Sequence, residues 1–424
     1  MNKVQNISLF LKLNRIVEKI PQINVSIDTK LDASLISRFE SGNRIPNAKQ
    51  MNLLLNYFGT DVETYSKEFP IISKRLSDLF IAIYEAQPYE VRERIIEAIP
   101  KDLIKKTHYF PYLYLFTFCH YVNAGKTAEA CSYYETLTKV VANYDEEMQA
   151  LFYMFSTLYH YDTNCIDLQL NDFRKLKSCQ VTDKRILALL HYFLLSTYPE
   201  RHSLKSILLH YQKCKEILTE DQNVFRLTML NMQLAILYGE YDLVKASIAT
   251  DLRTLEQLKP FTGITQLIKS LHFNLSWSYM RIHDYQSAFD HAYACKDDYH
   301  NRTIYFMLAF CCYQLNNHHD SKKYILAARK AQPSAQFYDY LLDWLEAMLE
   351  KPYQKKCIEV LLRIEKKLQY ELDFESTQSI FALIVDYYHH HHELEKMNQY
   401  LNQMELKNVI VSIPFNKPLP KNES

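Results

Sequence analysis

Apolar residues near the start of the chain recur with the period of an α-helix, and polar breaks divide them into short helices. A stripe with a period of about 3.6 residues covers positions 4–19 and predicts a first helix. Pro21 opens a second short helix, expected to run to about Thr29. A third helix is framed by Asp32, a good N-cap, and by Gly42, which suits the position after a last turn. Two short helices joined by a tight turn form a helix-turn-helix, whose second helix fits the DNA major groove.

From about residue 71 onward, apolar helical segments alternate with breaks rich in Pro or Asn. Residues 275–289 resemble the tetratricopeptide (TPR) pattern, with Ser276 and His283 in place of its two glycines. With Tyr279 as an anchor, equivalent positions recur every 34 to 41 residues, a period typical of helix-turn-helix repeats. The nine anchors are Tyr84, Tyr121, Tyr161, Tyr198, Tyr238, Tyr279, Tyr313, Leu349 and Tyr387. The alternative is an irregular helical domain in which the 33 tyrosines of the chain supply chance anchors.

Glycine is scarce, with 5 residues in a chain of 424. Phosphate-binding loops, dinucleotide turns and the nucleophile elbow of hydrolases all need clustered glycines, so these sites are excluded. Hairpin-rich β folds also depend on glycine, which leaves an all-α fold. Gly42 and Gly59 are expected to end helices, and Gly125 and Gly239 to lie in turns after repeat anchors.

No catalytic or metal-binding arrangement is apparent. The sequence offers no Ser/His/Asp or Cys/His set that spacing could support, so an enzyme is not expected. The run His389–His392 falls in an expected turn and is interpreted as a solvated loop rather than a metal site. We therefore expect neither a metal nor a cofactor.

The net charge and the distribution of cysteines bear on the binding partners and the cellular location of the protein. Lys and Arg together number 49, as do Asp and Glu, so the formal net charge is zero and any nucleic-acid contact has to be local. The nine cysteines are scattered without a C-x-x-C pair, which is typical of a reduced cytosolic protein. Neither a signal peptide nor a long apolar run occurs, so a cytoplasmic location without a membrane partner is expected.

The run from Gln22 to Pro46 resembles the helix-turn-helix of the phage-repressor (XRE/Cro/C1) family. The matching positions are Ile36, Ser37, Glu40, Gly42 and Pro46, while Ser26 and Lys30 stand where the family usually has Ala and Gly. The resemblance implies that Gln22 and the first amides of the second helix touch a phosphate and that the third helix faces base edges. The implied DNA-binding residues are Gln22, Ala33, Ser34, Ser37, Arg38, Asn43 and Arg44. It also implies that Arg15 of the first helix pairs with Glu40 of the third.

Stacked TPR-like units curve into a right-handed superhelix whose inner face comes from the first helix of each unit. Apolar and aromatic residues with a few amides suit an extended peptide, because amides bond its backbone while rings and Met hold its side chains. The candidate peptide-binding residues are Tyr192, Met229, Met232, Gln233, Phe273, Asn274, Trp277, Arg281, Met307 and Gln314. For each of them taken singly, core packing is the competing interpretation.

An XRE-type head followed by a TPR array resembles the peptide-pheromone-responsive regulators of Gram-positive bacteria, the Rgg/PlcR/PrgX (RNPP) family. The resemblance implies an all-α protein with a five-helix head at residues 1–68 and a repeat domain for ligand binding and dimerisation at residues 71–407. A non-helical tail is expected at residues 408–424. The implied function is quorum-sensing transcription regulation by a cytoplasmic homodimer, which binds double-stranded promoter DNA and takes a short peptide on its concave face. The alternative is a protein-interaction module whose repeats hold a protein partner and whose head serves docking.

Overall fold

The protein is all-α, as the scarcity of glycine predicts. The computed structural model describes residues 3–196, 203–261, 264–297, 301–332, 336–368 and 374–405, which form 24 α-helices and one 3-10 helix. Within these ranges there is no strand, only an isolated bridge between Asn301 and Gln332. The chain falls into two compact units, Met1–Leu230 (unit 1) and Asn231–Ser424 (unit 2). The tail expected at residues 408–424 lies outside the described residues.

The first part of unit 1 is a small helical head with its own hydrophobic cluster. Its helices are α1 (Lys3–Val17), α2 (Gln22–Thr29), α3 (Ala33–Glu40), α4 (Ala48–Tyr57) and α5 (Val62–Ser66). The cluster they enclose consists of Ile7, Phe10, Leu11, Val25, Ile36, Phe39, Leu54, Leu55 and Tyr65. Asp32 caps α3 by accepting from the Ser34 amide at 2.8 Å, and Gly42 follows α3 with a φ of 74°. The predicted third helix is therefore confirmed with its caps, and the second helix is confirmed with its start at Gln22, one residue after Pro21.

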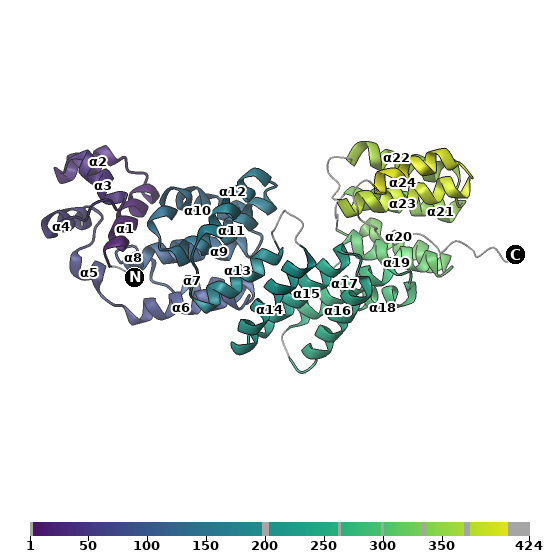
Figure 1. Cartoon of the computed structure of the whole chain (residues 1–424), viewed down its shortest axis with the longest axis horizontal. Coiled ribbons are helices and arrows are strands. Elements are labelled where there is room, and N and C mark those ends of the chain that lie inside the picture. The colour runs from purple at the N-terminus through teal and green to yellow at the C-terminus, as the bar shows by residue number, and fades with distance from the viewer. Residues whose placement is uncertain are drawn as a thin grey trace. The chain divides into compact units, whose positions relative to one another are not determined.

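The rest of unit 1 consists of helices joined by short turns, and consecutive helices pack in pairs (Figure 1). They are α6 (Pro70–Tyr84), α7 (Tyr89–Glu97), α8 (Lys101–Ile104), α9 (Phe110–Val122), α10 (Thr127–Val140), the 3-10 helix η1 (Val141–Asn143), α11 (Glu146–Asp162), α12 (Ile166–Ser178), α13 (Lys184–Ser196) and α14 (Leu204–Glu220). The helix α15 (Val224–Glu240) then leads into unit 2.

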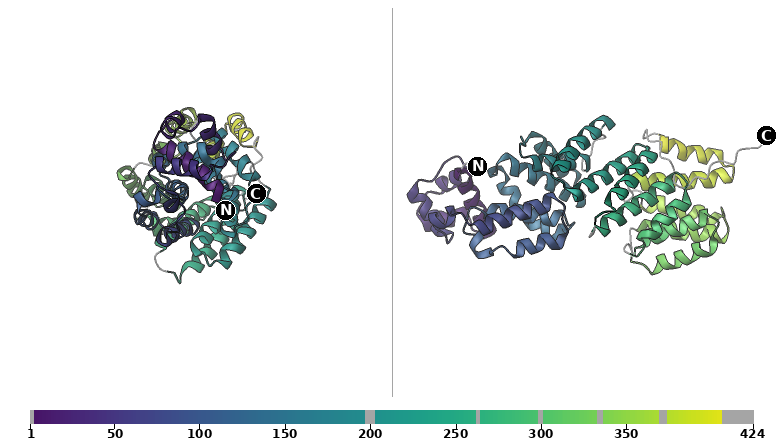
Figure 2. Two further views of the ribbon diagram at one scale, coloured as in Figure 1. Left: turned by 90° about the vertical axis from the view of Figure 1, so that its left-hand side faces the viewer. Right: turned by 90° about the horizontal axis from the view of Figure 1, so that it is seen from below.

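Unit 2 continues the same pattern. Its further helices are α16 (Val244–Leu258), α17 (Thr265–Arg281), α18 (Tyr285–Cys295), α19 (Arg302–Gln314), α20 (His318–Lys330), α21 (Gln336–Glu350), α22 (Lys355–Leu368), α23 (Phe374–His390) and α24 (Leu394–Glu405). Figure 2 shows the stacked helix pairs of each unit from two further directions. A continuous apolar core runs from α17 to α24, as expected where each repeat covers the open face of its neighbour.

The predicted repeat anchors mark the ends of first helices. Every anchor in the described residues lies in the last turns of α6, α9, α11, α15, α17, α19, α21 or α23, whereas Tyr198 lies outside those residues. Soon after each anchor, one residue adopts a positive φ that turns the chain into the next helix. These residues are Ala86, Gly125, Asn164, Asp242, His283, Asn316, Tyr353 and His392. The TPR-like repeat is therefore confirmed, and non-glycine residues hold seven of these eight turns.

Gly239 corrects one expectation. It does not lie in a turn but inside α15, and Asp242 supplies the left-handed residue of that turn. The Gly239 carbonyl oxygen accepts a hydrogen bond from Nη1 of Arg281 at 3.0 Å, and a Cβ at Gly239 would lie 3.0 Å from the same nitrogen. Glycine therefore serves a close approach between α15 and α17 rather than a turn conformation.

Candidate functional site

A buried carboxylate links three of the five helices of the candidate DNA-binding head, α1, α2 and α3. Glu40, only 3% exposed at the end of α3, accepts from Nε of Arg15 at 2.6 Å and from Nη2 of Arg15 at 2.7 Å. The side-chain amide of Gln22, at the start of α2, donates to the same carboxylate at 2.7 Å. The paired planar geometry is the strong form of an Arg–carboxylate contact. It fixes α2 and α3 against α1, as the family resemblance implies for Arg15 and Glu40.

Helix α3, the candidate recognition helix, has a buried face and an exposed polar face. Ile36, Phe39 and Glu40 face the head core. The predicted DNA-binding residues Ser34, Ser37, Arg38, Asn43 and Arg44 are all exposed, whereas Ala33 and Gln22 are half-buried. The Gln22 amide group is engaged with Glu40, so its place in the head is explained by helix packing. No side chain caps the N-terminus of α2, where backbone amides are available to an anion.

Unit 2 contains a cavity of about 250 Å³ bounded by helices from four repeats. Its walls come from α15, α16, α17, α21 and α23, so helices distant in sequence enclose it together. Pockets that enclose a whole drug-sized ligand measure about 300–1,000 Å³. A cavity of the observed volume suits a side chain or a short backbone segment of a larger ligand.

Two polar groups in the wall of this cavity have no hydrogen-bond partner among the residues that the structure describes. Both carboxylate oxygens of Asp251, a residue only 1% exposed, are unpaired, and so is Nδ2 of Asn274. Burial raises the pKa of the Asp251 carboxyl to about 8. An unsatisfied buried polar group costs about 1–3 kcal/mol, and more when it is charged. The cavity therefore presents an acceptor and a donor that a bound molecule could satisfy.

Four of the predicted peptide-binding residues line this cavity, all from α17. They are Phe273, Asn274, Trp277 and Arg281. The Arg281 guanidinium is partly engaged, because it donates to the Gly239 carbonyl at 3.0 Å and lies 3.5 Å from the Asp242 carboxylate. Arg281 thus holds α17 against the end of α15, while Phe273 and Trp277 supply the aromatic wall.

The other predicted residues lie elsewhere. Met307 is fully buried in the core of unit 2, since α19 packs between its neighbours, and it does not belong to the wall of this cavity. Met232, Gln233 and Gln314 are half-buried outside the cavity wall. In unit 1, Met229 lines a separate cavity, and the Tyr192 ring lies beneath the Arg226 guanidinium, 4.9 Å from its centroid.

Asp251 was not predicted from the sequence. The TPR register places the inner face of the superhelix on the first helix of each repeat, whereas Asp251 belongs to a second helix, α16. The sequence of α16 nevertheless indicates that Asp251 is unusual. The buried stripe of α16 consists of Val244, Ser247, Ile248, Asp251, Thr254 and Leu258, so a carboxylate interrupts a face that otherwise holds apolar residues and small hydroxyls. An acidic residue on the buried side of an amphipathic helix needs a partner or a function.

Two features are not found in the described part of the chain. No group of three or more His, Cys, Asp or Glu side chains there is placed to hold a metal ion. No helix in that part combines the length and apolar composition needed to cross a bilayer.

The repeat fold is shared with solved structures. RapI in its apo form matches with a TM-score of 0.56 and 16% identity, over 80% of this chain and 99% of RapI. A Rap protein complexed with Competence and Sporulation Factor matches with a TM-score of 0.57 and 11% identity, over 80% and 98%. NprR in complex with its cognate peptide NprX matches with a TM-score of 0.55 and 13% identity, over 81% and 100%. The resemblance to RNPP-type proteins is therefore confirmed at the level of the fold.

Sequence comparisons add no closer relative. No protein-family model matches the chain, and no curated protein matches it.

Proposed function

We propose that the chain is a cytoplasmic, non-enzymatic transcription regulator, which binds promoter DNA as a homodimer and responds to a short peptide. In this proposal residues 1–68 are the DNA-binding domain and residues 71–407 bind the ligand and form the dimer. The proposal of a peptide ligand rests on the unpaired polar groups of Asp251 and Asn274 in the cavity of unit 2.

The exposed polar face of α3 supports the DNA half. Ser34, Ser37 and Arg38 project from a helix whose opposite side is fixed by Phe39 and Glu40, so the helix presents side chains without having to reorganise. The head carries eight basic and six acidic residues within positions 1–66, a local charge of +2. Such a weak charge favours a dimer that presents two recognition helices to a two-fold operator.

The cavity of unit 2 supports the ligand half. A peptide backbone offers N–H donors to the carbonyl oxygen of the protonated Asp251 carboxyl, and carbonyl acceptors to its O–H and to the Asn274 amide, the groups left unpaired there. Phe273 and Trp277 beside them form the kind of aromatic wall that holds an apolar side chain. Two solved structures with this fold are complexes, NprR with its cognate peptide NprX and a Rap protein with Competence and Sporulation Factor.

The proposed DNA binding is tested by fluorescence anisotropy with a labelled duplex from the region upstream of the gene. Arg38→Ala should weaken binding by about 1–3 kcal/mol if the guanidinium reads a base edge. Arg75→Ala is the matched control, because Arg75 is an exposed arginine of α6 outside the head. Equal affinity of Arg38→Ala and wild type would remove α3 as the reading helix and favour the protein-interaction alternative.

The ligand half is tested by calorimetry with synthetic peptides taken from the ends of small secreted reading frames beside the gene. Asn274→Ala and Trp277→Ala should each weaken binding by about tenfold or more. Gln286→Ala, at an exposed position of α18, should leave it unchanged. If both cavity variants bind as tightly as the wild type, the peptide does not lie in this cavity.

A further inference from the structure

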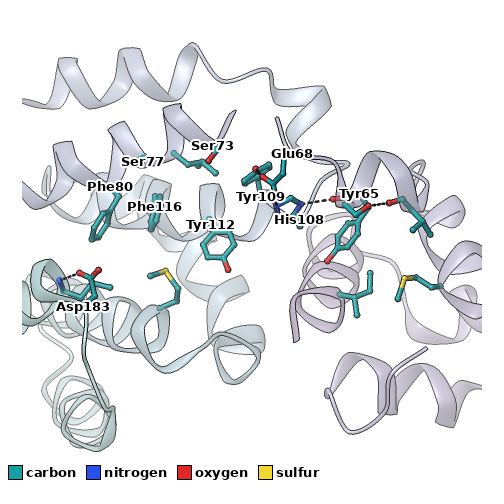
Figure 3. A pocket seen from close by; sticks show the side chains of 17 residues that line it. Tyr65, Glu68, Ser73, Ser77, Phe80, His108, Tyr109, Tyr112, Phe116 and Asp183 are labelled. Carbon is teal, nitrogen blue, oxygen red and sulfur yellow. Dashed lines mark hydrogen bonds and ion pairs between the residues drawn. The ribbon is translucent and has the colours of Figure 1, made fainter. Parts of the chain in front are cut away.

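A second and larger cavity lies in unit 1, where the head meets the repeats (Figure 3). It has a volume of about 660 Å³, within the range of cavities that enclose small-molecule ligands. Ile7, Met51 and Tyr65 contribute from the head, and α6, α9, α11 and α13 contribute from the repeats. The cavity is open to solvent, since Val62, Ser73 and Ser77 in its wall are exposed, so a ligand can enter it.

The wall of this cavity is mainly apolar, with a hydroxyl that has no partner. Phe80 and Phe116 stack with ring centroids 5.7 Å apart, and Leu76 and Ile186 extend the apolar surface. Tyr65, only 7% exposed, has a buried hydroxyl with no hydrogen-bond partner in the described part of the chain. Burial raises the pKa of this phenol, so the hydroxyl stays protonated and remains a donor. In Figure 3 the Tyr65 ring projects from the head toward the cavity.

The charged groups of the wall are already engaged. Glu68 accepts a hydrogen bond from the Tyr109 hydroxyl. Asp183 accepts from the backbone amides of Arg185 and Ile186 at 2.9 and 3.1 Å, as an N-cap does. No lysine or arginine lines the cavity. His108, which also lines the cavity, donates from Nδ1 to the Tyr65 backbone carbonyl at 2.8 Å and lies 4.0 Å from the Glu68 carboxylate, so each acidic and histidine side chain of the wall already has a partner within the protein.

We infer that this cavity binds a small uncharged aromatic molecule that accepts a hydrogen bond from the Tyr65 hydroxyl. Fused or linked rings match the apolar wall, and one carbonyl or ether oxygen satisfies the donor that the protein leaves unpaired. This site is separate from the peptide cavity of unit 2, and the inference does not rest on the proposed function.

A molecule bound in this cavity would contact both the head and the repeats of unit 1, and so would help to fix the head against the repeats. The polar contacts that join the head to the repeats include Thr60 to the Lys106 carbonyl at 2.8 Å and Asn143 to the Glu40 carbonyl at 2.7 Å. A molecule touching both bodies adds to these contacts and stabilises this placement of α3 over others.

Nile red tests the inference, because it is uncharged, has fused rings and a carbonyl oxygen, and shifts its emission to the blue in apolar surroundings. With the full chain we expect saturable 1:1 binding. Ser77→Trp fills the cavity from an exposed position of α6, so it should weaken binding by about tenfold or more. Lys74→Trp, on the same helix but outside the wall, is the matched control and should bind as the wild type does.

A third variant tests the assigned hydrogen bond. Tyr65→Phe removes only the hydroxyl and should weaken Nile red binding several-fold while leaving the unfolding temperature unchanged or higher, since no internal hydrogen bond is lost. Absence of saturable binding to the wild type, or equal affinity in the wild type and Ser77→Trp, would overturn the site. Equal affinity in Tyr65→Phe would overturn the assigned contact.

Discussion

Replacing Asp251 by Asn should stabilise unit 2 while impairing the proposed ligand site. The carboxyl of Asp251 has a pKa of about 8 in the folded chain against an ordinary value of 3.8, because burial disfavours its charged form. Between these two pH values the unfolded chain has released the proton while the folded chain still holds it. The free energy of unfolding therefore falls as pH rises from about 4 to about 8.

The expected magnitude follows from these two values. Each pKa unit corresponds to about 1.4 kcal/mol, so between about pH 5 and pH 8 the wild type should lose about 4 kcal/mol that Asp251→Asn retains. Asn has nearly the same shape but no proton to release, so the difference between variant and wild type should be small at the lower pH and large at the higher. Every other titrating group cancels in this difference.

The assay is urea unfolding followed by tryptophan fluorescence at both pH values. The only two tryptophans of the chain, Trp277 and Trp344, belong to unit 2, so the signal reports that unit alone. Asp290→Asn, at an exposed position of α18, is the matched control and should show no pH-dependent gain. A pH-independent difference between Asp251→Asn and the wild type would refute the reasoning that the carboxylate is buried without a partner.

Three further changes test other parts of the structure. Glu40→Ala leaves the Arg15 guanidinium without its carboxylate inside the head and should destabilise α1–α3 by about 3 kcal/mol, seen as faster amide hydrogen exchange there; unchanged exchange would contradict the bidentate pair. Burial and the neighbouring His210 lower the pKa of His191 to about 4. As the pH falls, His191 is therefore protonated at a lower pH in the folded chain than in the unfolded chain. Stability should therefore fall by about 2 kcal/mol between about pH 6.5 and 4.5, and His191→Gln should lose that dependence in urea titrations. Lys30→Gly relieves a φ of 55° after α2 and should raise stability by up to about 1 kcal/mol in thermal unfolding, whereas a loss would mean that the lysine side chain makes a stabilising contact.

The helices and their repeat could be predicted because their signals are local. The capped helix between Asp32 and Gly42 and the ladder of anchors depend on periodicity and on single terminating residues. The pairing of Arg15 with Glu40 came from the family resemblance, and the contact is present.

The cavity of unit 2 could not be predicted in full, because it depends on how the repeats curve. Phe337 and Ser379 reach the same cavity as Asn274 from helices far along the chain, and no local pattern fixes that meeting. Met307 has the register of an inner-face residue but belongs to a helix buried on more than one side. The repeat register predicts which face of one helix points to the inside of the superhelix. Which residues line the cavity also depends on how the neighbouring helices pack.

The left-handed turns also bear on how such a chain is detected. TPR patterns place glycine where this chain has Ser276 and His283, and the latter adopts a φ of 63° without being glycine. Asn164, Asp242 and Asn316 hold the same backbone conformation in other repeats. The dihedral angle is thus kept where the residue type is not. A profile that scores residue types gains little from these positions, whereas a comparison of backbones registers every one of them.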